Sequence, residues 1–190
     1  MSTVALVDYG AGNLGNVERA LGRLGFAVRR VRTPRDLRGD VILLPGVGAW
    51  GAAVRTLAER GVTAALRSAA REGHPVVGIC LGLQLLFDRS EESPGTDGLG
   101  ILAGCVRRLR APGLVLPHLG WAPVAGTPYY FAHSYCVVPD DPSVVAATAE
   151  WGEVFPAVVA HGVVRGVQFH PERSGEPGLY RLNDLLAEVT

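Results

Sequence analysis

Short apolar segments alternate with stretches of helical spacing through the first half of this chain. Four segments are predicted strands: residues 3–8, 27–31, 41–44 and 76–79. The last two contain no charged or polar side chain, which is typical of strands that helices cover on both faces. Residues 13–24 and 52–71 lie between strands and have helical periodicity, the second with a break near Gly61. This alternation predicts βαβ units wound into a mainly parallel, open sheet flanked by helices.

The second half of the chain has short predicted strands separated by Pro and Gly turns. We expect these strands, which begin at about Cys105, to be antiparallel additions, and residues 178–188 to form a closing helix. The chain has 190 residues, 48% hydrophobic and 19% charged, so it can bury a substantial core. No repeat or linker divides it. We therefore predict a single α/β domain over residues 1–190.

Composition excludes several classes of function. The formal net charge is zero, which argues against nucleic acid or a membrane surface as a partner. All 18 basic residues are arginine, so the side chains offer neither a Schiff-base amine nor a Walker-A clamp. No apolar run approaches the roughly 20 residues of a membrane span. Cys80, Cys105 and Cys136 lack C-x-x-C spacing and the first residues lack a signal-peptide pattern, so we expect a cytoplasmic location.

Cys80 lies at the junction between a predicted strand and the apolar, helical stretch that follows it. It is the centre of a G-x-C-x-G segment, residues 78–82, which matches a nucleophile elbow with sulfur in place of oxygen. Glycines two residues away on either side remove the Cβ atoms that such a sharp turn cannot accommodate. The amides that begin the next helix favour thiolate, the reactive species. A buried structural cysteine is the alternative.

His170 and Glu172 are the groups that could serve such a nucleophile. A cysteine nucleophile needs a general base, and the base needs a third group that fixes its orientation. Spacing of two in an extended segment places both side chains on one face, and Pro171 between them restricts the backbone. We therefore predict a Cys80-His170-Glu172 triad.

Three segments together resemble class I, triad-type glutamine amidotransferases. They are PGVG at residues 45–48, GICLGLQ at 78–84 and GVQFHPE at 166–172, which are similar to the oxyanion strand, the nucleophile elbow and the His/Glu segment of that family. The resemblance implies that Cys80 attacks the carboxamide of L-glutamine and that a thioester is hydrolysed to glutamate, with release of ammonia. It implies no cofactor and no metal.

The resemblance also suggests which groups hold the oxyanion and the substrate. Leu81 offers its backbone amide, and Val47 lies between two glycines that leave its peptide free to turn into or away from the site. Gln84 lies one helical turn from Cys80 and can present its amide to the substrate. The resemblance adds backbone groups of Gly46, Ser134 and Tyr135 around the glutamine carboxylate and amine.

Further segments, at residues 7–16, 117–121 and 131–135, resemble one branch of the family. In that branch the glutaminase forms a heterodimer with a (β/α)8-barrel cyclase of histidine biosynthesis, which makes imidazole glycerol phosphate and aminoimidazole carboxamide ribotide. Free ammonia is mostly protonated at neutral pH, so direct transfer to a partner is expected. Our candidates for the interface are Asn13, Trp121, Tyr135 and Arg173, which lie in segments near the ends of the motifs. Trp and Tyr are typical interface anchors, and a place in the core is the alternative for Trp121.

Other functions compete with this one. The glutaminase of another synthase, such as pyridoxal phosphate synthase, has a Gly-Gly-Glu-Ser-type segment where this chain has PGVG. A related cysteine hydrolase would act on a different amide, and a non-enzymatic scaffold would carry the triad without using it. We interpret His118, His133 and His161 as structural, because no two histidines have the spacing of metal ligands.

Overall fold

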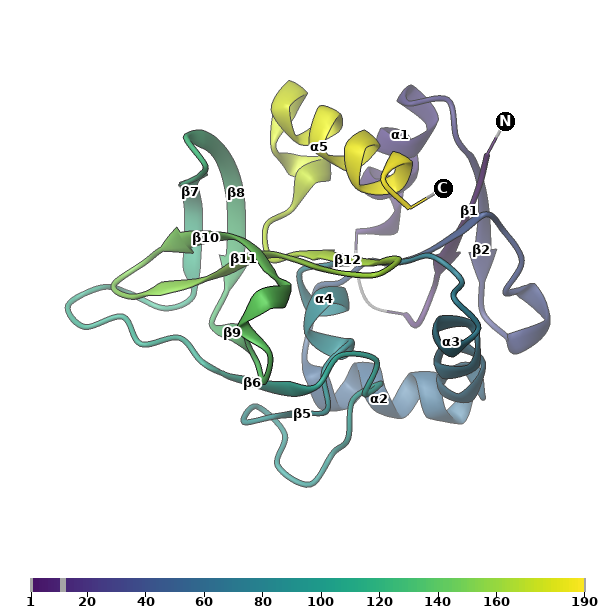
Figure 1. The fold of residues 1–190 in the computed structure, drawn as a ribbon, viewed down its shortest axis with the longest axis horizontal. Coiled ribbons are helices and arrows are strands. Elements are labelled where there is room, and N and C mark those ends of the chain that lie inside the picture. Colours follow the sequence, from purple (N-terminus) through teal and green to yellow (C-terminus); the bar gives the residue numbers. More distant parts are fainter. Residues whose placement is uncertain (1, 11–12, 190) are drawn as a thin grey trace.

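The structure, a computed structural model, describes residues 2–10 and 13–189 and centres on one sheet (Figure 1). Residues 1, 11, 12 and 190 of the predicted domain lie outside the described part. Two of them, residues 11 and 12, belong to the 7–16 segment. The seven strands of this sheet run in the order β10-β11-β12-β4-β3-β1-β2. In chain order they are β1 (Thr3–Val7), β2 (Ala27–Val31), β3 (Val41–Leu44), β4 (Val76–Ile79), β10 (Val145–Glu150), β11 (Val154–His161) and β12 (Val164–Val167).

Five strands of the large sheet are parallel, from β2 through β1, β3 and β4 to β12. Strands β11 and β10 continue it in antiparallel pairing. A three-stranded sheet joins β5 (Arg89–Ser90), β6 (Gly104–Arg108) and β9 (Tyr135–Pro139), and β7 (His118–Val124) pairs with β8 (Thr127–His133) as a hairpin. The prediction of a mainly parallel α/β sheet with antiparallel additions is therefore confirmed.

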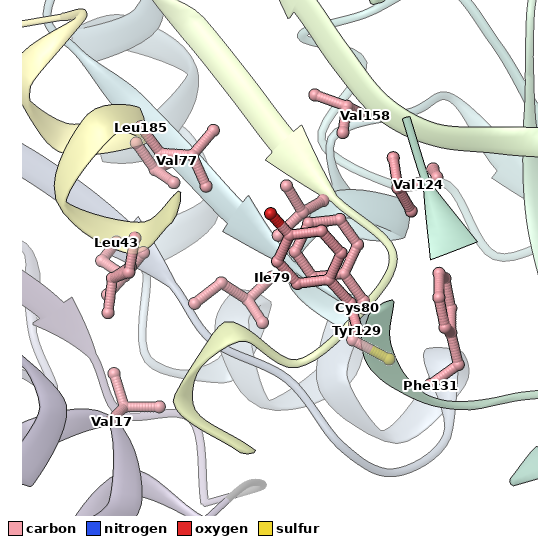
Figure 2. Packing of buried hydrophobic residues seen from close by; sticks show 14 of the residues in the cluster. Val17, Leu43, Val77, Ile79, Cys80, Val124, Tyr129, Phe131, Val158 and Leu185 are labelled. Atoms are coloured by element: carbon pink, nitrogen blue, oxygen red, sulfur yellow. The ribbon is translucent and has the colours of Figure 1, made fainter. Parts of the chain in front are cut away.

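Helices cover both faces of the sheet, because the strand residues alternate between two apolar clusters. Val4, Leu6 and Leu43 pack with α1 (Leu14–Arg23) and α5 (Gly175–Ala187), as Figure 2 shows for part of this cluster. Ala5 and Ile42 face the opposite way. They pack with α2 (Trp50–Glu59), α3 (Val62–Arg71) and α4 (Leu81–Leu85). Short 3-10 helices are η1 (Pro34–Asp36), η2 (Pro142–Val144) and η3 (Pro171–Arg173).

The helix break predicted near Gly61 is confirmed, whereas the predicted start of the closing helix needs correction. The stretch 52–71 is two separate helices, because Gly61 adopts a left-handed conformation with φ of +69° and ends the hydrogen bonding of α2. The closing helix begins at Gly175 rather than at residue 178. Pro177 lies in its first turn, where a missing N–H costs no hydrogen bond, so a proline there is no boundary. In the described part of the chain, no helix has the length and apolar character that crossing a membrane requires.

Candidate active site

Cys80 occupies the turn between β4 and α4, at the carboxyl end of a central parallel strand. Its φ is +52° and its ψ is −108°, a backbone conformation that residues other than glycine rarely adopt. The surrounding main chain fixes it: the Cys80 N–H donates to the carbonyl of Val167 at 2.7 Å, and its carbonyl accepts from the Gln84 N–H at 3.1 Å. Backbone strain of this kind persists where neighbouring structure enforces it, and it is concentrated at functional sites.

The glycines of the G-x-C-x-G segment are required by close approach of the backbone, as predicted. A Cβ on Gly78 would lie 2.7 Å from Cα of Leu83, and one on Gly82 would lie 1.9 Å from the carbonyl oxygen of Leu44. Helix α4, in contrast, has only five residues. Its macrodipole is therefore short, so the individual N–H groups near the sulfur matter more than the dipole that we invoked from the sequence.

His170 and Glu172 form a buried pair shortly after β12, at the start of the 3-10 helix η3 rather than in the extended segment that we predicted. Their side chains are 1% and 4% exposed, and Nδ1 of His170 lies 2.8 Å from Oε1 of Glu172. The main chain is held on both sides, since the His170 N–H donates to the Tyr130 carbonyl at 2.8 Å. The Ser174 hydroxyl donates to the His170 carbonyl at 2.7 Å. The imidazole is thus oriented by a carboxylate, as the general-base arrangement requires.

The other imidazole nitrogen, Nε2, is buried and makes no hydrogen bond of normal geometry with the described residues. Burial lowers the pKa of His170, but the negative charge of the Cys80 thiolate and the Glu172 carboxylate outweigh burial and raise it to about 10. The sulfur and the ring are therefore close enough to interact through their charges. A protonated imidazole beside the sulfur is the state of His170 that this electrostatic coupling favours.

A pocket of about 270 Å³ opens beside the sulfur. It is lined by Val47, Gly48, Cys80, Leu81, Gln84, Glu92, Pro117, Ala132, His133, Ser134 and Tyr135. Val47 and Gln84, predicted as oxyanion and substrate residues, are thus brought to one cavity with Ser134 and Tyr135. Gly46 lies just behind them, where a Cβ would come within 2.6 Å of the Gly82 nitrogen. A larger cavity of about 500 Å³, between α3 and the turn after β11, holds none of the predicted site residues.

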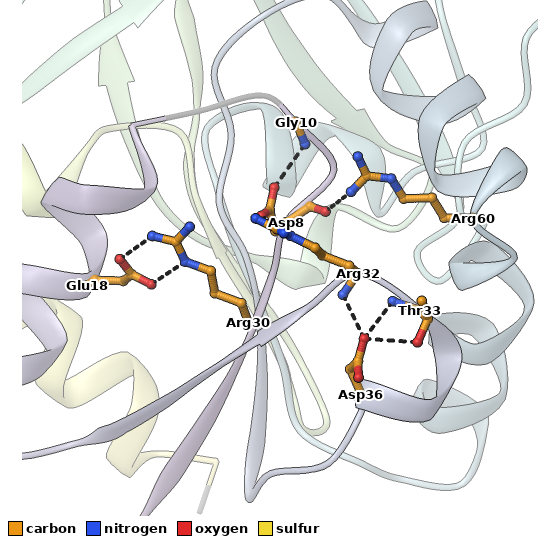
Figure 3. A network of polar contacts seen from close by, with 8 residues as sticks. All are labelled: Asp8, Gly10, Glu18, Arg30, Arg32, Thr33, Asp36 and Arg60. Carbon is orange, nitrogen blue, oxygen red and sulfur yellow. Dashed lines mark hydrogen bonds and ion pairs between the residues drawn. The ribbon is translucent and has the colours of Figure 1, made fainter.

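The side chain of Tyr9 is hydrogen-bonded to the predicted oxyanion strand, residues 45–48. Its buried hydroxyl donates to the carbonyl of Pro45, one peptide before the Gly46–Val47 unit. Burial, and then the charge of Cys80, raise the pKa of this phenol, so it remains a donor. Figure 3 shows how the preceding residue is held: Asp8 accepts from the Gly10 N–H and from Arg32. The oxyanion strand is therefore held at the Pro45 carbonyl, and the next peptide, Gly46–Val47, is the one that we expect to turn.

The Gln84 amide has a defined orientation in the pocket wall. Its nitrogen donates to the Tyr135 carbonyl at 2.9 Å and to Oε1 of Gln168 at 3.2 Å. Because a carbonyl oxygen can only accept, the nitrogen must be the atom that faces Tyr135. The oxygen of the Gln84 amide is then the atom left to accept a hydrogen bond from a ligand.

The four interface candidates do not form one cluster. Trp121 is 56% exposed and contacts the Tyr130 ring edge-to-face, with centroids 5.9 Å apart. The guanidinium of exposed Arg173 lies 4.2 Å from the centroid of the same ring. Tyr135, in contrast, is half-buried in the pocket wall, and exposed Asn13 caps α1 by accepting from the Asn16 N–H. Tyr130 thus links two of the candidates directly beside the His170 segment.

His118 and His133 form a buried pair next to the pocket, which agrees with their structural interpretation. Nδ1 of His118 lies 3.3 Å from Nε2 of His133, and Nδ1 of His133 lies 2.8 Å from the Tyr135 carbonyl. The His118 ring stacks on Trp151, with centroids 4.2 Å apart. Burial lowers the pKa of each imidazole to about 4, so both rings are neutral at pH 7. In the part of the chain that the structure describes, no group of three or more His, Cys, Asp or Glu could hold a metal.

This pair predicts a loss of stability in acid. A folded-state pKa of about 4, below the usual 6.5, means that the unfolded chain binds more protons between these values. Stability is therefore highest above pH 6.5 and falls as the pH drops towards 4, by up to about 3 kcal/mol for one fully buried ring. We expect His118→Phe, which keeps a stacking ring, to flatten this dependence. Urea unfolding at pH 7 and pH 4 gives the free energy of unfolding at each pH. An equal loss of this free energy between pH 7 and pH 4 in the two proteins would refute the prediction.

Comparison with known proteins assigns the chain to a protein family. The model of the family described as glutamine amidotransferase class-I matches residues 5–186. The chain belongs to this family. Two similar relatives are named imidazole glycerol phosphate synthase subunit HisH. The one from Moorella thermoacetica is 44% identical over 94% of this chain and 91% of its own length. The one from Exiguobacterium sibiricum is 45% identical over 95% and 93%.

Other similar proteins extend the comparison of this amidotransferase. Imidazole glycerol phosphate synthase hisHF, chloroplastic, from Arabidopsis thaliana is 42% identical over 97% of this chain, which spans only 34% of that longer protein. A solved structure titled as a glutamine amidotransferase superposes with a TM-score of 0.79 and 27% identity, over 98% of this chain and 99% of its own. PurLQS from Thermotoga maritima shares the fold, with a TM-score of 0.73 over 100% of both chains at 21% identity.

Sequence reasoning missed some residues of this amidotransferase site. Gln168 lies two residues before His170, which is the same sequence spacing that paired His170 with Glu172. That signal was available. Glu92 and Pro117 line the pocket from distant loops, and Tyr9 lies under the oxyanion strand. No local pattern connects these three to Cys80.

Proposed function

We propose that this chain is the glutaminase subunit of an imidazole glycerol phosphate synthase and works in histidine biosynthesis. It hydrolyses L-glutamine to glutamate and passes the ammonia to a (β/α)8-barrel cyclase subunit, with which it forms a heterodimer in the cytoplasm. The observation that carries this proposal is the near-full-length similarity to subunits of that name, at 44% and 45% identity. The buried Glu172–His170 pair beside Cys80 supplies the matching chemistry.

The first half of the reaction uses the resting thiolate and imidazolium. The Cys80 sulfur attacks the carboxamide carbon, and the C=O electron pair moves onto oxygen. The backbone N–H groups of Leu81 and Val47 then stabilise the oxyanion. When the oxyanion collapses, the C–N bond breaks and His170 gives its proton to the leaving nitrogen, which departs as ammonia. A γ-glutamyl thioester remains on the sulfur.

Water completes the reaction. His170, now neutral, takes a proton from the water as the water oxygen attacks the thioester carbon. The second oxyanion forms in the same donor pair, and its collapse breaks the C–S bond. Glutamate leaves, and the thiolate and imidazolium are restored. Glu172 holds the imidazole through Nδ1 and stabilises its positive charge in both halves.

The pocket wall offers complementary groups to the amino-acid end of glutamine. The free oxygen of the Gln84 amide is an acceptor suited to the α-ammonium group, because its nitrogen is held by Tyr135 and Gln168. Backbone groups of Gly46, Ser134 and Tyr135 are our candidates for the remaining contacts. Among these, Ser134 and Tyr135 line the pocket directly. A volume of about 270 Å³ suits a small amino acid rather than a nucleotide.

A barrel cyclase is the partner that fits the site and its relatives. The length of the hisHF relative beyond this chain leaves room for a second, fused subunit. Leu119 and Trp121 of β7 are 61% and 56% exposed, and both Trp121 and Arg173 contact the ring of Tyr130. Exposed aromatic and Arg side chains close to an active site are typical of an interface core. We propose Asn13, Trp121, Tyr135 and Arg173 as contacts with that cyclase.

We expect glutaminase activity to depend on the partner. If the Val47 amide points away from the oxyanion at rest, the isolated subunit lacks one donor, which costs about 100- to 1000-fold in kcat. Adding the barrel cyclase with its ribonucleotide ligand should raise glutamate release by about 100-fold. An unrelated (β/α)8-barrel protein serves as the control. A partner-free rate equal to the rate in the complex would contradict this prediction.

A further inference from the structure

The side chain of Gln168 lies between the nucleophile and the pocket wall. It is completely buried, with 0% exposure, and directly follows β12. Its Oε1 accepts from Nε2 of Gln84 at 3.2 Å, and its own Nε2 lies 3.6 Å from the sulfur of Cys80. The mechanism above makes no use of this amide, although it contacts the reacting atom.

The orientation of the Gln168 amide follows from the chemistry of its neighbours. The Tyr135 carbonyl can only accept hydrogen bonds, and it accepts from Gln84 and from Nδ1–H of His133. The NH2 group of Gln84 therefore faces Tyr135 and also reaches Gln168. Because Gln84 donates this hydrogen bond, the atom of the Gln168 amide that faces Gln84 must be its oxygen. The NH2 group of Gln168 therefore faces Cys80. The Tyr135 carbonyl thus sets the direction of the hydrogen bonds that run from Tyr135 through Gln84 and Gln168 to Cys80.

Two contacts of the sulfur select opposite protonation states. The carbonyl of Ala132, 3.9 Å away, can interact only with an S–H and therefore favours the thiol. The Gln168 N–H can only donate and therefore favours the thiolate. We propose that Gln168 is a further catalytic residue, whose amide N–H holds the Cys80 thiolate ready for attack; this inference rests on the proposed function.

Other ionisable groups near the sulfur come from separate elements. They are Tyr9 after β1, His170 and Glu172 around η3, and Glu92 and His133 in the pocket wall. Tyr9 and His133 are neutral at pH 7 because of burial. His170 supplies the positive charge. Substituting Gln168 leaves all five groups in place, so a change in thiolate behaviour reports the amide itself.

The test is the pH dependence of Cys80 alkylation by iodoacetamide in the full-length chain without glutamine. Alkylation of Cys80→Ala provides the background from Cys105 and Cys136, which are also free. For Gln168→Met we expect the half-maximal rate at a pH about 0.5 to 1 unit higher than in the unsubstituted chain, since one donor to the anion is lost. The plateau at high pH should be equal or higher, because a more basic thiolate is intrinsically more nucleophilic.

Gln168→Glu separates this role from a structural one. It keeps an oxygen acceptor for Gln84 but replaces the donor near sulfur with a negative charge. We expect a larger upward shift than for Gln168→Met, and a fall of about 10-fold in kcat of the cyclase complex with little change in KM. If Gln168 only supports Gln84, Gln168→Met should raise KM for glutamine and leave the alkylation profile unchanged, Gln168→Glu should restore KM, and that combined result would overturn the inference.

Thermal denaturation checks the folding of each variant. Gln168→Asn, which withdraws the donor by one methylene, replaces any variant that does not fold, and it should also show the upward shift. An unchanged alkylation profile in the folded variants overturns the role of Gln168 whether or not glutamine is hydrolysed. Failure of the unsubstituted complex to hydrolyse glutamine would instead overturn the proposed function, so the two failures are distinct.

Discussion

Replacing Cys80 with alanine is expected to abolish glutamine hydrolysis, with kcat reduced by about 10⁴-fold or more. Cys80 is the one thiol among the described residues that line the pocket. Without the sulfur no thioester forms, and His170 has no covalent intermediate to serve. The measurement is glutamate release in the presence of the cyclase and its ligand.

The same variant should leave the fold and the partner untouched. Alanine meets the same backbone demand as cysteine at φ of +52°, because both carry a Cβ. Synthesis by the cyclase from externally supplied ammonia should therefore continue at the rate seen with the unsubstituted chain. Cys105→Ser is the matched control, since Cys105 is outside the pocket and should retain hydrolysis. Glutamate release by Cys80→Ala above about one hundredth of the normal rate would exclude the thioester mechanism.

Local sequence patterns predicted the parallel part of the fold with good accuracy. Strands β2, β3 and β4 occupy the residues predicted for them. Of these, β3 and β4 are buried between helices, so burial and sequence pattern coincide there, whereas β2 is an edge strand with exposed Arg29 and Arg30. The start of the closing helix was harder to predict, because Pro177 is compatible with more than one local conformation. The strand order, with β12 beside β4, depends on contacts between distant segments, and no local pattern encodes it.

The candidate site divides in the same way. Cys80 was predicted because an elbow needs glycines at fixed positions. His170 and Glu172 were paired on the premise of an extended segment, whereas Glu172 lies in the 3-10 helix η3, where its carboxylate still reaches Nδ1 of His170. The contact of Gln84 with Gln168 joins residues 84 positions apart, and no periodicity specifies it. Trp121 was compatible with either core or surface, and its 56% exposure is a property of the β7–β8 hairpin rather than of its neighbours in sequence.

Substitution of Gly82 with alanine should have the largest effect on stability. The new Cβ would be placed 1.9 Å from the carbonyl oxygen of Leu44, an atom of β3 that cannot move without disturbing the central sheet. Helix α4 would have to shift away from β3, so we expect a loss of roughly 3 to 5 kcal/mol in the free energy of unfolding. Because α4 carries Leu81 and Gln84, hydrolysis should fall together with stability. Urea unfolding and glutamate release measure the two effects.

Gly22→Ala supplies the opposite result from the same chemical change. Gly22 lies in α1, where a new Cβ meets nothing within 4 Å, and alanine forms helices better than glycine. This variant should gain about 0.5 to 1 kcal/mol and keep full activity. A Gly82→Ala protein as stable as the unsubstituted chain would mean that the elbow can open without cost. The close approach of β3 and α4 would then not be what requires glycine at residue 82.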